Sequence, residues 1–379
     1  MFAQKNSLVQ LLSRQTKLKY IPEIDGLRFL AILPVISLHF FTTFSRYNGK
    51  YQESHLKDYL PYDVINTLGS GVYLFFAISG FILSLPFARH YLFNHKKVSL
   101  KYYFIRRVTR LEPPYMITLT LFFIVHLVIS NEAFVNVLSH YMASAFYMHN
   151  IIYDAWSTIN PVAWSLEIEI QFYLLVPLLV QVFRIKNVAI RRGIIIFSIV
   201  IFVFLQETID LRYYNLNLSI VNYAQYFMCG LLVADLSLSR ALGKYPTIIY
   251  DILATLFIPL MFYVSTNKTW FIIAIFLVFV GVLGGKYVKA MFQIKLLTII
   301  GGMCYTIYLV HYPLYHLLIK ITNRLLVGDN ILLDISTHYM LHISIIIMGS
   351  AIMYVFIEKP FMDYKWPEKA MALIKRYSK

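Results

Sequence analysis

Two ionisable side chains in one apolar segment, Arg28 and His39, have the types and spacing needed for group transfer. They are eleven residues apart, about three turns of helix, so a helix would present both on one face about 16 Å apart along its axis. A phosphate held at the guanidinium, with an extended arm of that length such as phosphopantetheine, would bring its far end to the imidazole. The alternative is a basic residue that anchors the segment at the membrane surface, together with an unrelated buried histidine.

A second basic pair, Arg107 and Arg110, precedes another apolar run in the segment from Tyr102 to Tyr115. Residues three apart share one face if the segment is helical. Guanidinium groups suit bidentate binding of phosphate. The competing interpretation is topological, because basic residues beside a span fix its orientation and contact anionic lipid headgroups.

Two carboxylates follow a helix-start signature at Asn160-Pro161. Glu167 and Glu169 are two residues apart, so they face nearly opposite sides and at most one can easily point into a helix bundle. Counted from the outer end of the helix, Glu169 lies about 13 Å deep and His39 roughly 8–10 Å deep. A meeting is therefore possible, and a carboxylate beside an imidazole would raise its basicity and fix its tautomer. The alternative is a helix cap or a structural ion pair.

Other histidines have weaker signals. His311 lies about 22 Å from the inner end of its apolar segment, and alone it would be read as a satisfied core histidine. His149 and Asp154 match a His-x-x-x-x-Asp spacing that is used by acyltransferases that esterify glycerol phosphate. The other motifs of those enzymes are absent, so the match is interpreted as chance. His338 and His342 could share a metal across one helical turn, but no third ligand is apparent and a structural role is favoured.

The elements that must position these residues are membrane helices. Of the 379 residues, 59% are hydrophobic and only 14% are charged, with a mean hydropathy of +0.64, whereas soluble domains carry about 25% charged residues. This composition excludes a soluble globular protein, and 30 Tyr with 29 Phe exclude disorder. The formal charge of +15 is spread over short loops, which argues against nucleic acid as a partner. The two cysteines provide neither a disulfide framework nor a zinc motif.

The expected fold is all-α, one polytopic bundle of about ten transmembrane helices. A span needs about 20 mostly apolar residues, and the candidate ranges are 27–46, 66–86, 113–131, 164–183, 193–209, 219–236, 248–265, 269–284, 296–319 and 336–357. The small residues between Gly69 and Gly80 favour close helix packing within the second range.

The distribution of Lys and Arg predicts the orientation of the bundle. With the N-terminus inside, the inner segments hold 26 basic residues and the outer ones 7, so both termini are expected to be cytoplasmic. Residues 1–26 would form a cytoplasmic leader and residues 358–379 a cytoplasmic tail. The largest outer segment, 132–163, is rich in Tyr and Trp and is expected to form helices at the outer interface. The whole chain, 1–379, is expected to be a single membrane domain.

Taken together, these segments resemble the membrane-bound acyltransferase family 3, whose members O-acylate sugars at cell surfaces. Six short motifs carry the resemblance in register: Asp25-Gly-Leu-Arg28 with His39, Phe75-Phe76 with Ser79-Gly80, Arg107 with Arg110, Trp164-Ser-Leu with Glu169 and Phe172-Tyr173, Tyr305 and Tyr308 with His311 and Pro313, and Glu358-Lys-Pro360. The family places its glutamate five residues after the tryptophan, which selects Glu169 over Glu167. A second acidic residue usually follows, and this chain has Ile170 there.

The resemblance implies transfer of an acyl group, with acetyl expected, from cytoplasmic acyl-CoA to a hydroxyl of an extracytoplasmic polysaccharide, lipid-linked sugar or glycolipid. His39 would be the base or a transient acyl carrier, with Glu169 in support, and no metal is expected. The residues implied to hold the CoA phosphates are Arg28, Arg107 and Arg110. The residues that could support the site are Asp25, Ser79, Trp164, Tyr305 and His311.

Many relatives also carry a C-terminal hydrolase-like domain, whereas this sequence runs 19 residues beyond Pro360. The expectation is that no such domain is appended, and that any hand-on step uses a separate partner protein. No Gly-x-Ser-x-Gly elbow for a nucleophilic serine is present in the sequence. The alternative functions are a transporter or flippase for a lipid-linked saccharide and a polysaccharide polymerase. The paired broken helices typical of transporters are not apparent.

Overall fold

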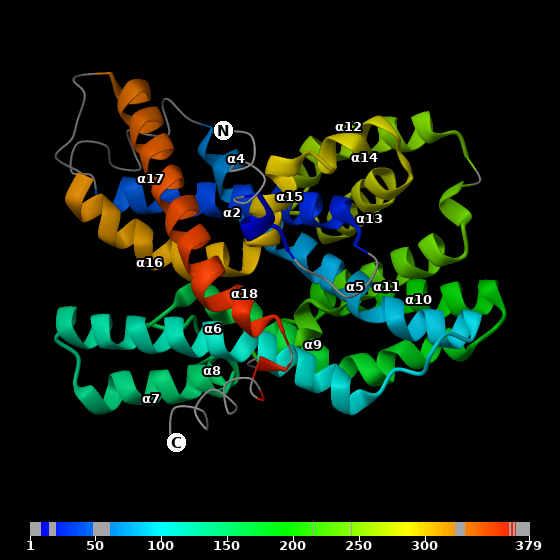
Figure 1. The fold of residues 1–379 in the computed structure, drawn as a ribbon, viewed down its shortest axis with the longest axis horizontal. Coiled ribbons are helices and arrows are strands. Elements are labelled where there is room, and N and C mark those ends of the chain that lie inside the picture. Colours follow the sequence, from blue (N-terminus) through cyan, green and yellow to red (C-terminus); the bar gives the residue numbers. More distant parts are fainter. Residues whose placement is uncertain are drawn as a thin grey trace.

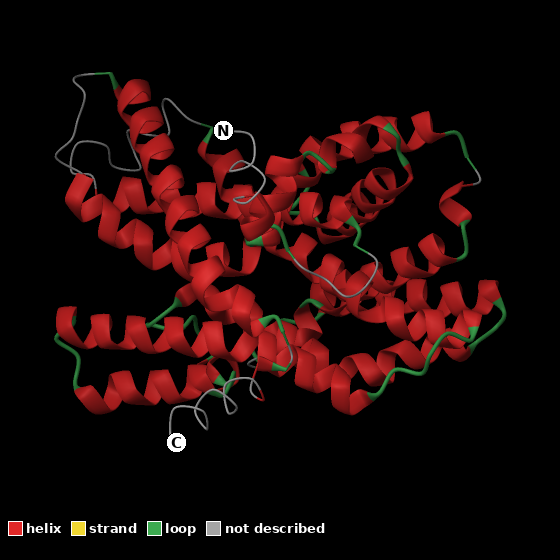
Figure 2. Cartoon of the chain, viewed as in Figure 1, coloured by secondary structure: helices red, strands yellow, loops and turns green. Residues whose placement is uncertain are grey.

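The computed structural model describes residues 9–14, 20–47, 61–214, 216–243, 245–322, 330–363, 365–366 and 368. Within these residues the chain is helical and contains no strand (Figures 1 and 2). Much of the predicted leader and tail, including 1–8, 15–19 and 369–379, lies outside the described residues.

The helices in chain order are α2 (Pro22–Tyr47), α4 (Tyr62–Thr67), η1 (Leu68–Ser70), α5 (Gly71–Phe93), α6 (Leu100–Ile129), α7 (Phe134–Ala145), α8 (His149–Tyr153), η2 (Pro161–Ala163), α9 (Trp164–Leu179), η3 (Val180–Arg184), α10 (Val188–Thr208), η4 (Ile220–Asn222), α11 (Ala224–Leu238), η5 (Ala241–Gly243), α12 (Thr247–Tyr263), α13 (Lys268–Gly284), α14 (Tyr287–Phe292), α15 (Lys295–Gly302), α16 (Cys304–Thr322), α17 (Ile331–Met353), the π-helical turn η6 (Tyr354–Glu358) and α18 (Lys359–Phe361).

Each of the ten predicted ranges falls on a helix or on a pair of joined helices. Six helical stretches of the described chain are long and apolar enough to cross a membrane: Pro22–Tyr47, Asp63–Phe93, Leu100–Ile129, Pro161–Arg184, Val188–Thr208 and Ile331–Phe361. A seventh is the pair α15 and α16, which is bent by 69°. The remaining three ranges correspond to the shorter apolar helices α11, α12 and α13. The structure therefore has six or seven clear candidates for spans, and a count of ten remains a prediction.

One boundary differs from the sequence prediction. The segment before residue 113 is predicted as an inner loop, but α6 begins at Leu100, so only residues 94–99 connect α5 to α6. Two prolines, Pro113 and Pro114, lie inside α6. Pro113 has no N–H and cannot bond the carbonyl of Thr109; the indole Nε1 of Trp366 donates to that carbonyl instead, at 3.1 Å.

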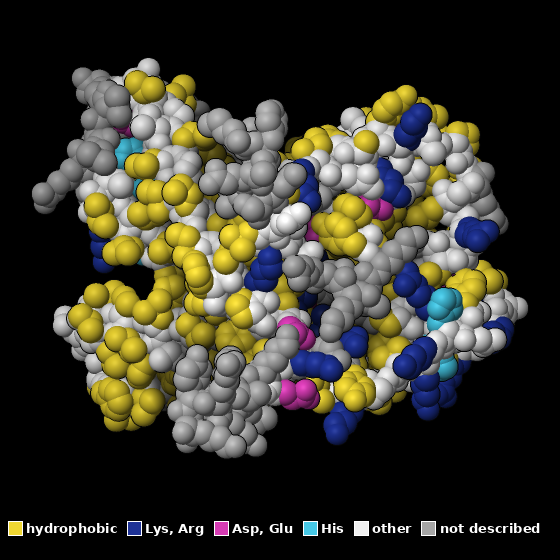
Figure 3. All heavy atoms as spheres, in the orientation of Figure 1, with side chains coloured by type: hydrophobic (Ala, Val, Ile, Leu, Met, Phe, Trp, Pro, Cys, Tyr) yellow, Lys and Arg dark blue, Asp and Glu magenta, His cyan; other side chains and the backbone are white. Residues whose placement is uncertain are grey.

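Helix α2 is central to the arrangement, because α5, α15 and α16 all pack against it (Figure 1). The predicted outer segment is helical in part: α7 packs against α6, and α8 follows it. On the face drawn in Figure 3, Lys and Arg side chains gather near the end of α5 and the start of α6, whereas hydrophobic side chains cover the distal parts of α6 and α7. A stretch of apolar surface this wide is expected for helices that face lipid.

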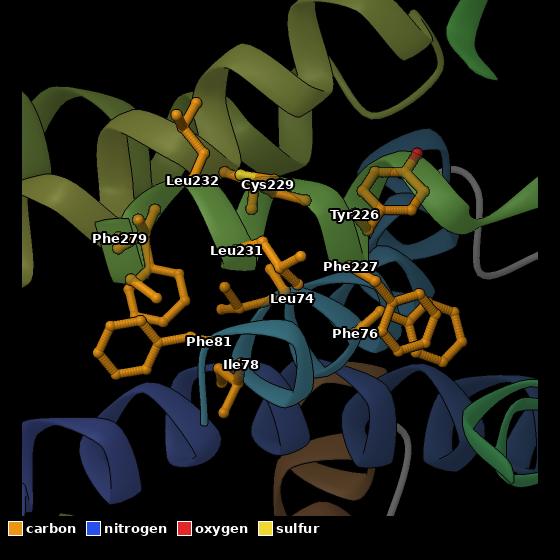
Figure 4. Packing of buried hydrophobic residues seen from close by; sticks show 14 of the residues in the cluster. Leu74, Phe76, Ile78, Phe81, Tyr226, Phe227, Cys229, Leu231, Leu232 and Phe279 are labelled. Carbon is orange, nitrogen blue, oxygen red and sulfur yellow. The ribbon is translucent and has the colours of Figure 1, made fainter. Parts of the chain in front are cut away.

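The larger hydrophobic core lies where α5 crosses α11, with Phe279 of α13 packed against Phe81 (Figure 4). A Cβ atom on Gly80 would collide with the backbone at Phe227, and one on Gly230 would collide with the backbone at Ala77. Each glycine therefore lets the other helix approach closely. This confirms the packing role predicted for the small residues of the second range.

Candidate active site

Two adjoining cavities lie beside α2. The inner chamber has a volume of about 100 Å³ and the mouth has a volume of about 680 Å³, and both are bounded by Arg28, Ile82, Arg107 and Arg110. The mouth is strongly basic, with the cationic or titratable residues Arg14, Arg28, Arg89, His95, Lys96, Arg106, Arg107, Arg110 and Lys359 around it. The three arginines predicted from the sequence are thus brought together where a wide basic cavity narrows.

The first arginine group is held by one carboxylate. Asp25, which is 2% exposed, accepts hydrogen bonds from Arg28 and from Arg14, the latter at 3.3 Å. Arg14 gives no signal of its own in the sequence, since it lies in the leader among other basic residues. Burial lowers the pKa of Arg14 to about 9, and repulsion from Arg110 and Arg28 acts in the same direction. An anion bound beside Arg14 would oppose both effects.

The second group is centred on Glu358 in the π-helical turn. Glu358 is fully buried; its Oε2 accepts a hydrogen bond of 2.5 Å from Thr306, and its Oε1 lies 3.6 Å from Arg110 Nη2. The sequence motif Glu358-Lys-Pro360 gives no indication of this partner, which is distant in the chain. Buried charges in proteins are paired in this way because an isolated one is costly.

The third group joins Arg107 to the inner chamber. Its guanidinium carbon lies 5.8 Å from the centre of the Tyr173 ring, within cation–π range. The Tyr173 hydroxyl and the Ser79 hydroxyl each donate to Glu169 Oε1, both at 2.5 Å. Glu167 faces elsewhere and accepts from the backbone N–H of Asn150 at 2.8 Å. The prediction that the two glutamates face different sides is confirmed, and Glu169 is the one that lines the chamber.

Several guanidinium groups retain an unpartnered N–H. The buried Nε atoms of Arg14, Arg107 and Arg110 have no hydrogen-bond partner within the described part of the chain. Buried polar groups normally find partners. Donors left open around a cavity are suited to an anionic ligand with several oxygens, such as a phosphate.

His39, from α2, meets a different partner from the one predicted. Its Nδ1 lies 2.8 Å from Nε2 of His311, on α16, whereas the hydrogen bonds of Glu169 go to Ser79 and Tyr173. The expectation of similar depth assumed that α9 starts at the outer surface. Instead, Asn160 just before it donates to Leu309 O at 3.1 Å, so the segment already starts beside the middle of α16. Glu169 consequently lies deeper, next to the arginines.

The other residues expected to support the site are near these groups. Tyr305 lines the chamber and donates to Leu111 O at 2.8 Å. Tyr308 also lines it, lies 2.8 Å from Ser165, and has its ring centre 6.1 Å from that of His311. Trp164 packs edge-on against Phe76, with ring centres 6.4 Å apart. Tyr308 thus both lines the chamber and lies near His311.

The remaining histidine candidates have structural partners. His149 bonds with His140 at 2.9 Å and with Ala155 O at 3.1 Å, and no contact of His149 with Asp154 is recorded within the described residues. His338 contacts the carbonyls of Asp334 and Thr322, and His342 bonds to the hydroxyl of Thr322. Across the described ranges no group of three or more His, Cys, Asp or Glu side chains could hold a metal.

A multi-helix membrane fold with a wide basic cavity that adjoins a narrow chamber is suited to group transfer from an anionic donor. Residues 21–357 match the family described as an acyltransferase domain. The chain therefore belongs to this family, the membrane acyltransferases that the sequence motifs indicate, and it is a multi-pass bacterial membrane protein. No solved structure matches it.

Curated relatives are named as O-acetyltransferases. The chain is 27% identical over 329 residues to the peptidoglycan O-acetyltransferase OatA of Listeria monocytogenes, covering 78% of this chain and 49% of the relative. It is 25% identical over 373 residues to O-acetyltransferase OatA of Staphylococcus aureus, covering 90% of this chain and 57% of that protein. A putative O-acetyltransferase of the same species is 24% identical, with 92% and 58% covered. The chain thus spans about half the length of the curated relatives it matches.

Proposed function

We propose that this protein transfers an acetyl group from acetyl-CoA, bound in the basic mouth from the cytoplasmic side, to a hydroxyl of a cell-surface polysaccharide. The observation that carries the proposal is the arginine-lined constriction between the two cavities, with Arg28, Arg107 and Arg110 common to both. The names of the relatives support acetyl as the group and a cell-wall polysaccharide such as peptidoglycan as the acceptor.

The donor is proposed to lie along α2. Its nucleotide phosphates would take the open N–H groups of Arg14, Arg107 and Arg110, and its pantetheine arm would enter the narrow chamber. From Arg28 to His39 the axial distance is about 16 Å, comparable to that arm. The large mouth suits the bulky nucleotide, and the small chamber suits a thin chain that excludes bulk water.

His39 is proposed to act as the general base. The acceptor hydroxyl gives its proton to the imidazole as its oxygen attacks the thioester carbonyl; the carbon–sulfur bond then breaks, and the thiolate leaves as CoA and regains a proton. General bases contribute about 10²–10⁴-fold in rate. Glu169 accepts hydrogen bonds from Ser79 and Tyr173. It is proposed to support the donor end of the path, because Glu169 lies nearer to the arginines than to the histidine pair.

Cys304 provides a direct test of where the donor binds. It lines the inner chamber, whereas Cys229 on α11 is buried in the hydrophobic core outside both cavities and serves as an internal reference. We expect CoA to slow alkylation of Cys304 in purified protein, measured by peptide mass spectrometry, and to have no such effect in Arg107→Ala/Arg110→Ala. Equal alkylation rates with and without CoA in the wild-type protein would contradict the proposed donor path.

The acceptor requires a cellular experiment. Mass spectrometry of surface polysaccharides from cells with and without the gene should show a loss of acetyl ester in the deletion strain. Complementation with His39→Ala should fail to restore the ester while giving normal protein levels in the membrane. Full restoration by His39→Ala would remove the histidine from the proposed mechanism.

A further inference from the structure

The hydrogen bonds around His311 determine which of its ring nitrogens carries the proton. Nδ1 of His311 lies 3.0 Å from Ile307 O and 2.8 Å from Tyr308 O. Carbonyl oxygens can only accept hydrogen bonds, so Nδ1 must be the N–H donor. His311 is fully buried, and no carboxylate contact to it is recorded among the described residues; a charged imidazolium there would be costly. The neutral ring therefore has a lone pair on Nε2.

The same reasoning extends to the partner ring. Nδ1 of His39 lies 2.8 Å from the lone pair on His311 Nε2, so His39 must donate through Nδ1–H. A neutral imidazole has one N–H, which leaves Nε2 of His39 with its lone pair. We infer that His311 is a positioning residue that fixes the tautomer of His39, so that Nε2 of His39 is the atom that accepts the proton of the acceptor hydroxyl.

The inference rests on the proposed function, in which His39 is the base, and assigns a role that the prediction had given to Glu169. The positioning group here is a neutral imidazole rather than a carboxylate, so no charge is buried beside His39. In serine proteases, exchange of the group that fixes the histidine tautomer lowers kcat about 10⁴-fold. The neutral pair lacks the charge stabilisation of a carboxylate, so a smaller loss, about 100-fold or more, is expected when His311 is removed.

Kinetics of two substitutions separate positioning from packing. His311→Ala should lower kcat by about 100-fold or more and leave the KM for acetyl-CoA close to that of the wild type, because the arginines are untouched. His311→Gln can place its amide oxygen where Nε2 was and accept from His39 Nδ1–H, so it should recover most of the lost kcat. If His311→Gln is as inactive as His311→Ala while both are folded, or if His311→Ala retains full kcat, the inference fails.

The chain offers a matched control. His140 and His149 form a second histidine pair, with Nδ1 of His140 2.9 Å from Nε2 of His149, and this pair does not border either cavity. His140→Ala breaks a hydrogen bond of the same kind and length, and it should leave kcat and both KM values unchanged. A loss of kcat equal to that of His311→Ala would show that breaking any such pair disturbs the fold, and would overturn the inference.

The tautomer can be measured without acyl transfer. Solid-state ¹⁵N spectra of histidine-labelled protein in lipid, with the His39 signals assigned by difference from His39→Gln, should show N–H at Nδ1 of His39, and a changed pattern in His311→Ala. An N–H at Nε2 of His39 in the wild-type protein would overturn the inference but would not contradict the proposed donor site. The expected N–H at Nδ1 of His39, together with full activity of His39→Ala, would instead refute His39 as the proposed base. The hydrogen bond between His39 and His311 would still be supported.

Discussion

The arginines of the cavity differ in what holds each of them. Arg14 and Arg28 share Asp25, Arg110 faces Glu358, and Arg107 lies over the ring of Tyr173. Removing any one of them therefore has different consequences for affinity and for stability, although all would contribute to the same proposed donor site.

Loss of the guanidinium fork should weaken donor binding even where the charge is kept. Arg107→Lys is expected to raise the KM for acetyl-CoA by about tenfold or more, because hydrogen bonds to charged groups are worth about 1.5–3 kcal/mol and an ammonium cannot bind bidentately. Steady-state kinetics with varied donor measure this effect. Arg212→Lys, at an exposed position outside both cavities, is the control, and an unchanged KM in Arg107→Lys would return that residue to a topological role.

Arg110→Ala should cost stability as well as affinity, since it leaves Glu358 buried without its cationic partner. Breaking a buried pair in this way costs about 3–5 kcal/mol. Arg110→Ala/Glu358→Gln should recover the apparent Tm in detergent without recovering the KM for acetyl-CoA. If the single and double variants have the same apparent Tm, Glu358 does not depend on Arg110 for its burial.

At the residue level, the sequence indicated Arg28 and His39 because ionisable groups in apolar segments stand out, and the family resemblance indicated Ser79 and Tyr305. The partners of those groups could not be predicted in the same way. Glu358 meets Thr306 across 52 positions and His39 meets His311 across 272, and such contacts depend on how helices cross. The sequence allowed Glu169 to meet His39, whereas the hydrogen bonds of Glu169 go to Ser79 and Tyr173, because the depth at which α9 starts depends on the contact of Asn160 with α16.

At the level of the elements, the close contact of α5 with α11 depends on two glycines that face each other. This contact holds the chamber-lining side of α5, with Phe76 and Ser79, in place. Helix positions and apolar ranges were largely predictable from the sequence, because hydrophobic length is a strong signal. The start of α6 was not predictable, because a proline pair usually marks a helix boundary. Here the Trp366 indole donates a hydrogen bond to the carbonyl of Thr109, which Pro113 cannot bond.

Gly80→Ala should destabilise the protein, because the added methyl group meets the backbone of α11. Overpacking of this kind costs about 1–3 kcal/mol, and thermal unfolding in detergent would show it as a lowered Tm. Gly193→Ala in α10 is the matched control: a Cβ there has nothing within 4 Å, and alanine favours helix by about 1 kcal/mol. A Tm for Gly80→Ala at or above that of Gly193→Ala would contradict the close packing of α5 on α11.

At the scale of the whole molecule, the number of membrane spans depends on whether three short helices cross the membrane. Helices α11, α12 and α13 have 15, 17 and 17 residues, or about 22–26 Å of length against a hydrocarbon core of about 30 Å. The distribution of basic residues among the loops that flank these three helices favours a complete crossing of the membrane by each helix.

Reporter fusions can decide this. A fusion after residue 265, between α12 and α13, should report the outer side, and fusions after 242 and 285 should report the cytoplasm, because 26 of the 34 Lys and Arg fall on the predicted inner side. Identical signals at all three positions would make α12 and α13 a re-entrant hairpin, and the bundle would then have fewer than ten spans.

The contacts around Lys359 and Trp366 have a consequence for biosynthesis. Lys359 donates to the carbonyls of Gln10 and Leu11, and Trp366 donates to Thr109 on the helix that carries Arg107 and Arg110. Lys359, Met362 and Asp363 also border the mouth, together with Arg14. Membrane segments emerge from the ribosome in order, so a nascent chain cannot complete this cavity until residue 363 has been made. A stalled or clipped product that ends before that point would insert into the membrane with the proposed donor pocket incomplete, and we expect that it would not consume cellular thioester.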